Sequence, residues 1–483
     1  MKKKKIIGMI LALAVGSSTL AACGGGDAES GKATASGDEI PTLKWVTVGT
    51  GMPKNYETWL GQVNPYLEEK IGVNIEMEVV PWGDWDNRRS IVTNSGEYFD
   101  LFFTDKTRYN MEVASGVFMD LTNMLNETPK LYDMLPEDYW RAVSVDGKIY
   151  GVPTYKDCSL TEYFIWDKDI ADKYGIDINK TNDFEALYNE LGKVRDGEGS
   201  APLHFSDSGA NALLDMYYDN AGVGSFVGVN YDDETRTVVN PLENEIVLSQ
   251  LDTVYKMYSE GIINGDAPTA DDAPKYRMLF LGQGWSGAAK TSWGPNSGIA
   301  NCEAVQFGET VMSNKTVQGS INSIFSGSEN PAKALEFLQL INTDTKLRDL
   351  FYYGVEGEDF NYVEDNKVEK VNSDWSMAGY TQGTFFNVSQ LSSVDFNQWD
   401  EVKELNQNAK PSPLLGFTVD LSSMETEVAS CTAVYEKYRK EFFTGAQNPR
   451  ELIKTINAEL EAAGWEKVRE ETQRQIDAFN FES

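Results

Sequence analysis

The chain has 483 residues, and its 75 acidic side chains outnumber its 42 basic ones, giving a formal charge of −33 at neutral pH. Nucleic-acid binding needs basic side chains that neutralise phosphates, so this balance excludes nucleic acid as a partner. Residues 40–483 exceed what a single hydrophobic core usually serves, so we expect two lobes.

The N-terminus has the features of an export signal. Four lysines, Lys2 to Lys5, precede a 15-residue apolar stretch from Ile6 to Leu20. This stretch is shorter than the roughly 20 residues that span a bilayer, so it predicts a signal peptide over residues 1–22. The sequence LAAC at its end resembles the lipobox of bacterial lipoproteins, which implies that Cys23 is lipidated. The alternative is an ordinary signal peptide that ends near a cysteine by chance.

A tether is predicted after the lipobox. Residues 24–39 read GGGDAESGKATASGDE and contain no large apolar side chain, so they lack the surface needed to fold. We therefore expect a lipidated cysteine and flexible tether over residues 23–39. Two acyl chains hold a protein durably at a membrane, which places it at the outer face of the cell membrane, anchored by lipid only.

The first elements alternate between strand and helix. The sequence predicts strands over 43–51, 73–82 and 98–105, with a helix over 56–72 and another over 84–96 between them. This β, α, β, α, β order indicates a mostly parallel, doubly wound sheet. Ligands bind such sheets beyond the carboxyl ends of the strands, so we expect one crevice lined by Thr47 to Met52, Pro81 to Asp86 and Thr104 to Lys106.

Helix signals recur further along the chain. Asn182 is a candidate N-cap for a helix whose apolar side chains are Phe184, Leu187, Leu191 and Val194. Pro331 and Pro449 each stand at a first helical position after an asparagine. The last 35 residues have the pattern of an amphipathic helix packed on a lobe.

The sequence gives little support for a catalytic site, a metal site or a cofactor site. His204 is the one histidine, which argues against histidine metal sites and histidine-assisted nucleophiles. Cys158, Cys302 and Cys431 are far apart, so we expect buried free thiols. We therefore expect no catalytic residue, no metal and no cofactor. A pair of carboxylates for glycoside hydrolysis stays possible, because 75 acidic residues provide many pairs.

Six segments in order carry a family resemblance: VPWGDWD, SGEYFDLFFTD, GKIYGVPTYKD, WDKDIADKYGID, YGVEGEDF and NAKPSPLLGFTVD. With the lipobox and tether, they resemble extracellular solute-binding proteins of ABC sugar importers, family 1, and most closely the LipO-like subgroup with its characteristic C-terminal domain. This resemblance implies an α/β, two-lobed periplasmic-binding-protein (Venus-flytrap) fold, in which each lobe is a mostly parallel sheet flanked by helices.

The resemblance also implies domain boundaries. The N-terminal lobe is expected to comprise 40–150 and 317–375, and the C-terminal lobe 153–315 and 380–483. The hinge is expected near 151–155, 311–319 and 369–384. Trp285 departs from maltose-binding relatives, which often carry a polar residue there, so we interpret it as a surface or interface position.

Candidate ligand contacts are aromatic and charged side chains beside the expected cleft. Flat rings suit the apolar faces of sugars, and charged groups bond to hydroxyls strongly. Asp105 and Asp157 are expected to accept sugar hydroxyls from opposite lobes, with a Lys156 and Asp157 hinge salt bridge as the alternative. The candidates are Trp82, Trp85, Asp105, Lys106, Tyr155, Lys156, Asp157, Trp293 and Phe417.

The resulting interpretation is a lipid-anchored, monomeric substrate-binding component that captures an oligosaccharide between two lobes and delivers it to ABC permease subunits. Two alternatives stay open. One is the same fold binding a peptide or other non-sugar solute, and the other is a lipoprotein glycoside hydrolase.

Overall fold

The computed structural model describes residues 40–372, 374–375 and 377–481. The predicted signal peptide, Cys23 and the predicted tether lie outside the described residues. Among the described helices, none combines the length and apolar character needed to span a membrane.

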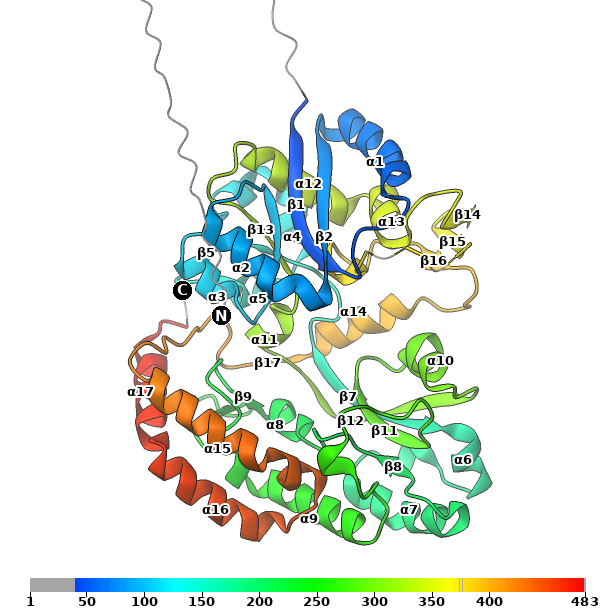
Figure 1. Cartoon of the computed structure of the whole chain (residues 1–483), viewed down its shortest axis with the longest axis vertical. Coiled ribbons are helices and arrows are strands. Elements are labelled where there is room, and N and C mark those ends of the chain that lie inside the picture. The colour runs from blue at the N-terminus through cyan, green and yellow to red at the C-terminus, as the bar shows by residue number, and fades with distance from the viewer. Residues whose placement is uncertain (1–39, 373, 376, 482–483) are drawn as a thin grey trace, which may run out of the picture. The chain divides into compact units, whose positions relative to one another are not determined.

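The first sheet has five strands in the order β2, β1, β3, β13, β6. Their bounds are β1 (Thr42–Gly49), β2 (Asn74–Pro81), β3 (Leu101–Thr104), β6 (Val152–Pro153) and β13 (Ile321–Ile324). β1 pairs in parallel with both β2 and β3, as predicted. β1 and β2 lie side by side in Figure 1. β13 then pairs antiparallel with β3 and with β6. A strand from much later in the chain therefore completes this sheet.

The second sheet also has five strands, in the order β17, β12, β7, β11, β8. Their bounds are β7 (Leu160–Asp167), β8 (Leu203–His204), β11 (Leu279–Gln283), β12 (Cys302–Met312) and β17 (Lys410–Pro411). The central strand β7 is antiparallel to both β11 and β12. The α/β class is confirmed, but both sheets are mixed rather than mostly parallel, because each has two parallel and two antiparallel pairings.

Helices surround both sheets. Those of the first lobe are α1 (Tyr56–Ile71), α2 (Trp85–Ser95), α3 (Tyr109–Ala114), α4 (Pro129–Met134), α5 (Glu137–Ala142), α12 (Pro331–Thr343) and α13 (Thr345–Tyr353). Those of the second lobe are α6 (Lys168–Lys173), α7 (Phe184–Glu198), α8 (Ala212–Tyr217), α9 (Glu245–Ser259), α10 (Gly294–Ser297), α15 (Glu425–Thr444), α16 (Pro449–Ala462) and α17 (Trp465–Ala478). α14 (Gln398–Asn408) lies in a segment that connects the lobes. The short helix α11 (Asn314–Val317) lies between β12 and β13.

Short strands lie outside the two main sheets. They are β4 (Ser144–Val145), β5 (Lys148–Ile149), β9 (Tyr218–Asp219), β10 (Val229–Asn230), β14 (Phe360–Glu364), β15 (Lys367–Lys370) and β16 (Gln390–Leu391). β14, β15 and β16 form a small sheet, and Phe360 and Val368 anchor it in the core of the first lobe.

Local sequence explains where the predicted helices begin and end. In α1, the buried side chains recur every fourth residue from Trp59 to Ile71, and Gly72 ends the helix with a φ of +68°. The cap of α7 is Asp183 rather than the expected Asn182, because the Asp183 carboxylate accepts the N–H of Ala186 at 2.7 Å. The segment after Pro331 forms two helices, α12 and α13, since Asp344 caps the start of α13.

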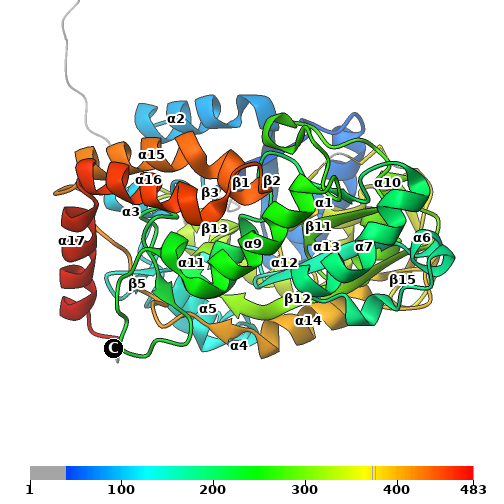
Figure 2. The ribbon, with the colours of Figure 1, turned by 90° about the horizontal axis from the view of Figure 1, so that it is seen from below.

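Two hydrophobic cores define the lobes. The first draws its buried residues from 43–158 and 312–388, together with Leu415. The second draws on 164–307 and 414–476. α15 and α16 pack against α9, and the Trp465 indole donates to the carbonyl of Phe226 at 2.8 Å. The C-terminal helices therefore gather at one end of the second lobe, opposite α6 (Figure 2).

Three segments connect the two lobes. They run over 154–159, 313–320 and 392–409. The first two overlap the predicted crossings at 151–155 and 311–319. The third lies beyond the predicted 369–384, because Met377 and Val388 are still buried in the first core. The burial of Val388 in the first core also means that residues 380–388 belong to the first lobe. The boundaries expected from the sequence assign them to the C-terminal lobe instead.

The three connections touch one another beside the cleft. The hydroxyls of Thr154 and Ser320 are hydrogen-bonded at 2.8 Å. The Asn406 side chain donates to the carbonyl of Lys156 and accepts the N–H of Cys158 at 3.0 Å. Cys158 is buried and free, as are Cys302 and Cys431, which confirms that expectation.

Candidate functional site

A pocket of about 270 Å³ lies between the lobes, against the first two connections. Of the predicted ligand contacts, Asp105, Lys106, Lys156 and Asp157 all line it. The other lining residues are Ser159, Leu160, Asp215, Tyr218, Asp219, Asn220, Tyr231, Gln283, Ser313, Lys315, Thr316 and Gly319. Both lobes therefore contribute side chains to one polar cavity.

Two ion pairs line this pocket. Lys156 Nζ lies 2.9 Å from Asp157 Oδ1, and Lys315 Nζ lies 2.8 and 2.9 Å from the two oxygens of Asp215. Burial alone would lower the pKa of Lys156. The nearby Asp157 carboxylate has the stronger effect, so the pKa is raised overall. The pocket thus presents charged groups already in pairs, which limits the cost of burying them.

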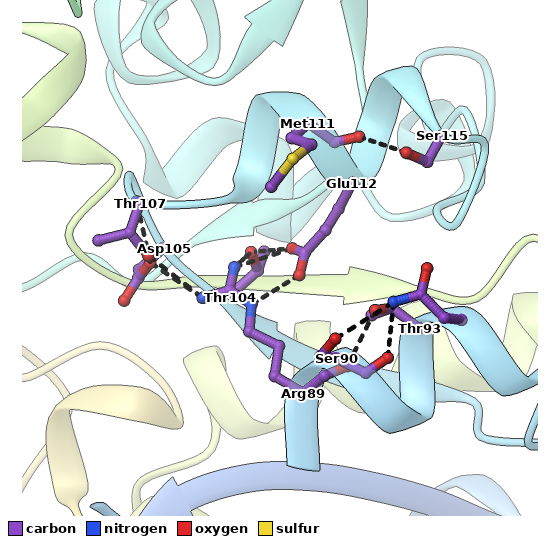
Figure 3. Close-up of polar contacts among 10 residues, drawn as sticks. Arg89, Ser90, Thr93, Thr104, Asp105, Thr107, Met111, Glu112 and Ser115 are labelled. Carbon is purple, nitrogen blue, oxygen red and sulfur yellow. Dashed lines mark hydrogen bonds and ion pairs between the residues drawn. The ribbon is translucent and has the colours of Figure 1, made fainter. Parts of the chain in front are cut away.

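A buried arginine, Arg89, forms an ion pair with Asp105 (Figure 3). Arg89, on α2, is 1% exposed and lies 3.2 Å from Asp105 Oδ1. Its Nε and Nη2 donate to the two oxygens of Glu112 at 2.6 and 2.9 Å. Nη2 also donates to the Thr104 hydroxyl at 2.6 Å. Burial alone would lower the pKa of Arg89. Its hydrogen bonds to Glu112 and the charge of that carboxylate have the stronger effect, so the pKa is raised overall.

The two oxygens of Asp105 have different surroundings. Oδ1 accepts from Arg89 and from the N–H of Thr107 at 3.0 Å, as well as from the Thr107 hydroxyl. Among the described residues, no hydrogen bond reaches Oδ2. A carboxylate fixed through one oxygen can accept a hydrogen bond from a ligand with the other.

An aromatic surface adjoins the pocket. Trp82, in a 3₁₀ turn after β2, is 46% exposed and stacks on Tyr380 with ring centroids 5.9 Å apart and an interplanar angle of 9°. The Lys156 ammonium lies 5.8 Å from the centroid of the same Tyr380 ring. The exposed Trp82 face and the charged pocket are therefore linked through one tyrosine.

The remaining predicted aromatic contacts are packed into the protein. Trp85 is 5% exposed and lies against Phe102 and Phe103, since α2 begins at this residue and turns its ring inward. Tyr155 is buried against Tyr139 and Phe386. Phe417 is buried against Phe479, although it also lines a second cavity.

Trp293 is half-buried and lies against two glycines at the end of β11. Its ring comes so close to Gly282 and Gly284 that a Cβ on Gly284 would lie 2.8 Å from it. Tyr163 packs on the same ring at 5.8 Å. Trp285, expected at a surface or interface, packs on Trp399 at 5.7 Å. Of the predicted aromatic contacts, Trp82 has the most exposed ring.

The comparisons with known proteins agree with this architecture. The family described as "Bacterial extracellular solute-binding protein" matches residues 49–346. The chain belongs to this family. A "Domain of unknown function (DUF3502)" matches residues 413–481, which hold α15, α16 and α17. The family is one of extracellular binding proteins, so this protein is a binding protein and not an enzyme.

Two relatives of this solute-binding protein come from Streptococcus pneumoniae. A "Carbohydrate ABC transporter substrate-binding protein" of Streptococcus pneumoniae serotype 4 is 29% identical over 97% of this chain and 96% of its own length. The crystal structure of the N-glycan transport solute-binding protein NgtS from Streptococcus pneumoniae is 25% identical and has a TM-score of 0.82, covering 91% of this chain and 98% of NgtS. NgtS in complex with Man5GlcNAc is also 25% identical, with a TM-score of 0.68 over the same shares.

Proposed function

We propose that this solute-binding protein is the lipid-anchored, monomeric binding component of an ABC importer and captures an oligosaccharide between its lobes. The observation that carries the proposal is the polar pocket built from both lobes beside the exposed ring of Trp82. Paired charges offer hydrogen bonds to sugar hydroxyls, and a flat ring offers a surface for the apolar face of a pyranose. The pneumococcal relatives, named for carbohydrate and N-glycan transport, support the same solute class.

The mode of capture follows from the position of the pocket. A solute that touches Asp105 on the first lobe and Gln283 on the second favours the arrangement in which both lobes approach it. A ligand shifts a conformational equilibrium by its difference in affinity for the two states, so binding here favours the closed form. The closed form is then the one recognised by permease subunits.

The test of binding is calorimetry on residues 24–483 with a panel of oligosaccharides that includes Man5GlcNAc. We expect saturable one-to-one binding without any change in the saccharide. Binding to peptides but to no saccharide would contradict the proposed solute class.

The test of anchoring uses the full-length chain in a bacterial host. We expect the chain to take up labelled fatty acid and to fractionate with the membrane, and we expect Cys23→Ala to lose the label and enter the soluble fraction. Membrane association that persists without label would contradict lipid anchoring.

A further inference from the structure

A second cavity continues the inter-lobe pocket. It measures about 530 Å³ and shares Lys106, Asp219, Asn220 and Lys315 with the first pocket. We call it the side chamber. It is lined from the first lobe by residues 106–108 and 110–111, from the second by residues 219–224, 414, 417–419 and 421, and from the second connection by Asn314, Lys315 and Gln318. An oligosaccharide in the first pocket can therefore extend into the side chamber.

The charge of the side chamber is opposite to that of the whole chain. The chain carries 75 acidic and 42 basic residues, but the chamber is lined by Lys106, Arg108 and Lys315 against a single acid, Asp219. Burial raises the pKa of Asp219, whose carboxylate accepts the Ser412 hydroxyl at 2.6 Å. Lys315 is paired with Asp215. Lys106 and Arg108 therefore give the chamber its excess positive charge.

Arg108 differs from the other arginines. Every other arginine in the described part of the chain has a side-chain ion pair, hydrogen bond or aromatic contact. None of these contacts is found for the Arg108 guanidinium among the described residues. A guanidinium presents a planar fork of donors that fits a carboxylate with two parallel bonds.

The loop that bears both cations is fixed. The N–H of Lys106 donates to the carbonyl of Gln318 at 2.7 Å, and the N–H of Arg108 donates to the carbonyl of Asp105 at 3.1 Å. Asp105 is in turn held by the buried Arg89 (Figure 3). A fixed backbone lowers the entropy that these side chains lose when they bind a ligand.

The side chamber also has apolar lining from the second lobe. It includes Val223, Leu414, Phe417, Val419 and Leu421. A cavity lined by both cations and apolar side chains suits a ring that carries C–H groups and a negative charge.

We propose that the side chamber binds a carboxylate-bearing sugar residue of the captured oligosaccharide, with Arg108 and Lys106 recognising the carboxylate. This inference rests on the proposed function and narrows its solute class to acidic oligosaccharides. Uncharged sugars would leave the excess charge of the chamber unmatched.

The experiment compares one glycan in three forms by calorimetry: a sialylated N-glycan, the same glycan with each sialic acid carboxylate converted to its amide, and the desialylated glycan. We expect the sialylated form to bind about tenfold more tightly than the amide form, and the advantage to shrink as salt is added. Arg108→Gln should remove most of the advantage while binding of the desialylated form changes little. Lys106→Gln should also reduce the advantage, but it should weaken the desialylated form as well, because Lys106 lines the first pocket too. Lys130→Gln, an exposed charge removal on α4, is the matched control and should keep the advantage.

Several results would overturn the inference. Equal affinity for the acid and amide forms would overturn it while leaving the proposed function in place. An equal loss of affinity for the sialylated and the desialylated form in the Arg108→Gln variant would also overturn it. A sulfated glycan that gains as much as the sialylated one would show that the chamber responds to charge and not to a carboxylate. Failure of all forms and of other saccharides to bind would overturn the proposed function as well.

Discussion

Leu414 and Leu415 are neighbours in the chain, but their side chains are buried in different lobes. Leu414 belongs to the core of the second lobe, and Leu415 to the core of the first. The backbone beside them is fixed to a connecting segment, since the N–H of Gly416 donates to Asn314 Oδ1 at 3.0 Å and Asn314 Nδ2 donates to the carbonyl of Phe417 at 2.7 Å. Residues 412–417 therefore tie the lobes together in addition to the three connections.

Truncation of Leu415 should loosen this tie. Leu415→Ala removes buried methyl groups and should lower the free energy of unfolding by about 2–5 kcal/mol. It should also raise the radius of gyration of the ligand-free protein, measured by small-angle X-ray scattering, because the lobes lose a shared contact. Leu414→Ala, the matched control, should destabilise the second lobe to a similar degree without this expansion. The same radius in both variants would contradict the tie.

Trp82 and Trp85 are expected to respond differently to the same substitution. Trp82→Ala removes an exposed ring, so oligosaccharide affinity should fall about tenfold while the free energy of unfolding stays nearly constant. Trp85→Ala removes a buried ring and should cost about 3–5 kcal/mol of stability. Urea denaturation and calorimetry on both variants check the pair. A stability loss of several kcal/mol in the Trp82 variant would count against its assignment to the ligand surface.

Substitution of Arg89 should reduce both stability and binding. Arg89→Ala leaves the buried Glu112 carboxylate without its partner, which costs about 3–5 kcal/mol. Arg89→Lys keeps the charge but loses the planar guanidinium that holds Glu112, Thr104 and Asp105 together. The free energy of oligosaccharide binding should therefore fall by more than the free energy of unfolding. Asp105→Ala, which removes the carboxylate itself, should weaken binding more than tenfold. Unchanged affinity in the Asp105 variant would refute its role in the site.

Glu162 should make stability depend on pH. It lies on β7, is 6% exposed, and is paired in register with Gln283 and Phe307. Burial, and then the charge of Asp215, raises its pKa from 4.5 to about 7. The folded state therefore holds a proton that the unfolded state releases above pH 4.5, so this contribution to stability falls as the pH rises from about 4.5 to about 7.

Glu162→Gln tests this titration, because glutamine has no proton to lose in that range. Urea denaturation at pH 5 and pH 7.5 should show a smaller loss of stability in the variant than in the parent chain, by at least about 1 kcal/mol. Equal pH dependence in the two proteins would mean that Glu162 does not titrate as described.

The first lobe was largely predictable from sequence because its elements are long and periodic. The apolar spacing from Trp59 to Ile71 predicted α1, and the β-branched run ending at Gly49 predicted β1. The second sheet was harder, since β8 and β17 have two residues each and carry no alternation. Its antiparallel pairings depend on contacts between segments far apart in the chain, which periodicity does not encode.

The pocket was predictable only where its residues follow strand ends. Asp105 and Lys106 come directly after β3, which is where parallel sheets place ligands. Asp215 and Lys315 come from the short helices α8 and α11 and Tyr231 from a loop, and no local pattern marks them. The aromatic predictions were less selective, because a ring after a strand turns outward in Trp82 and inward in Trp85.

The position of β13 has a consequence for how the chain acquires its structure. β13 lies between β3 and β6, so the first sheet stays incomplete until Ile321–Ile324 emerge, after nearly the whole second sheet has been synthesised. Pairings between such distant segments form slowly, because the intervening loop must close first. The growing polypeptide therefore stays unfolded for longer, and an unfolded polypeptide is what an export channel can thread across a membrane.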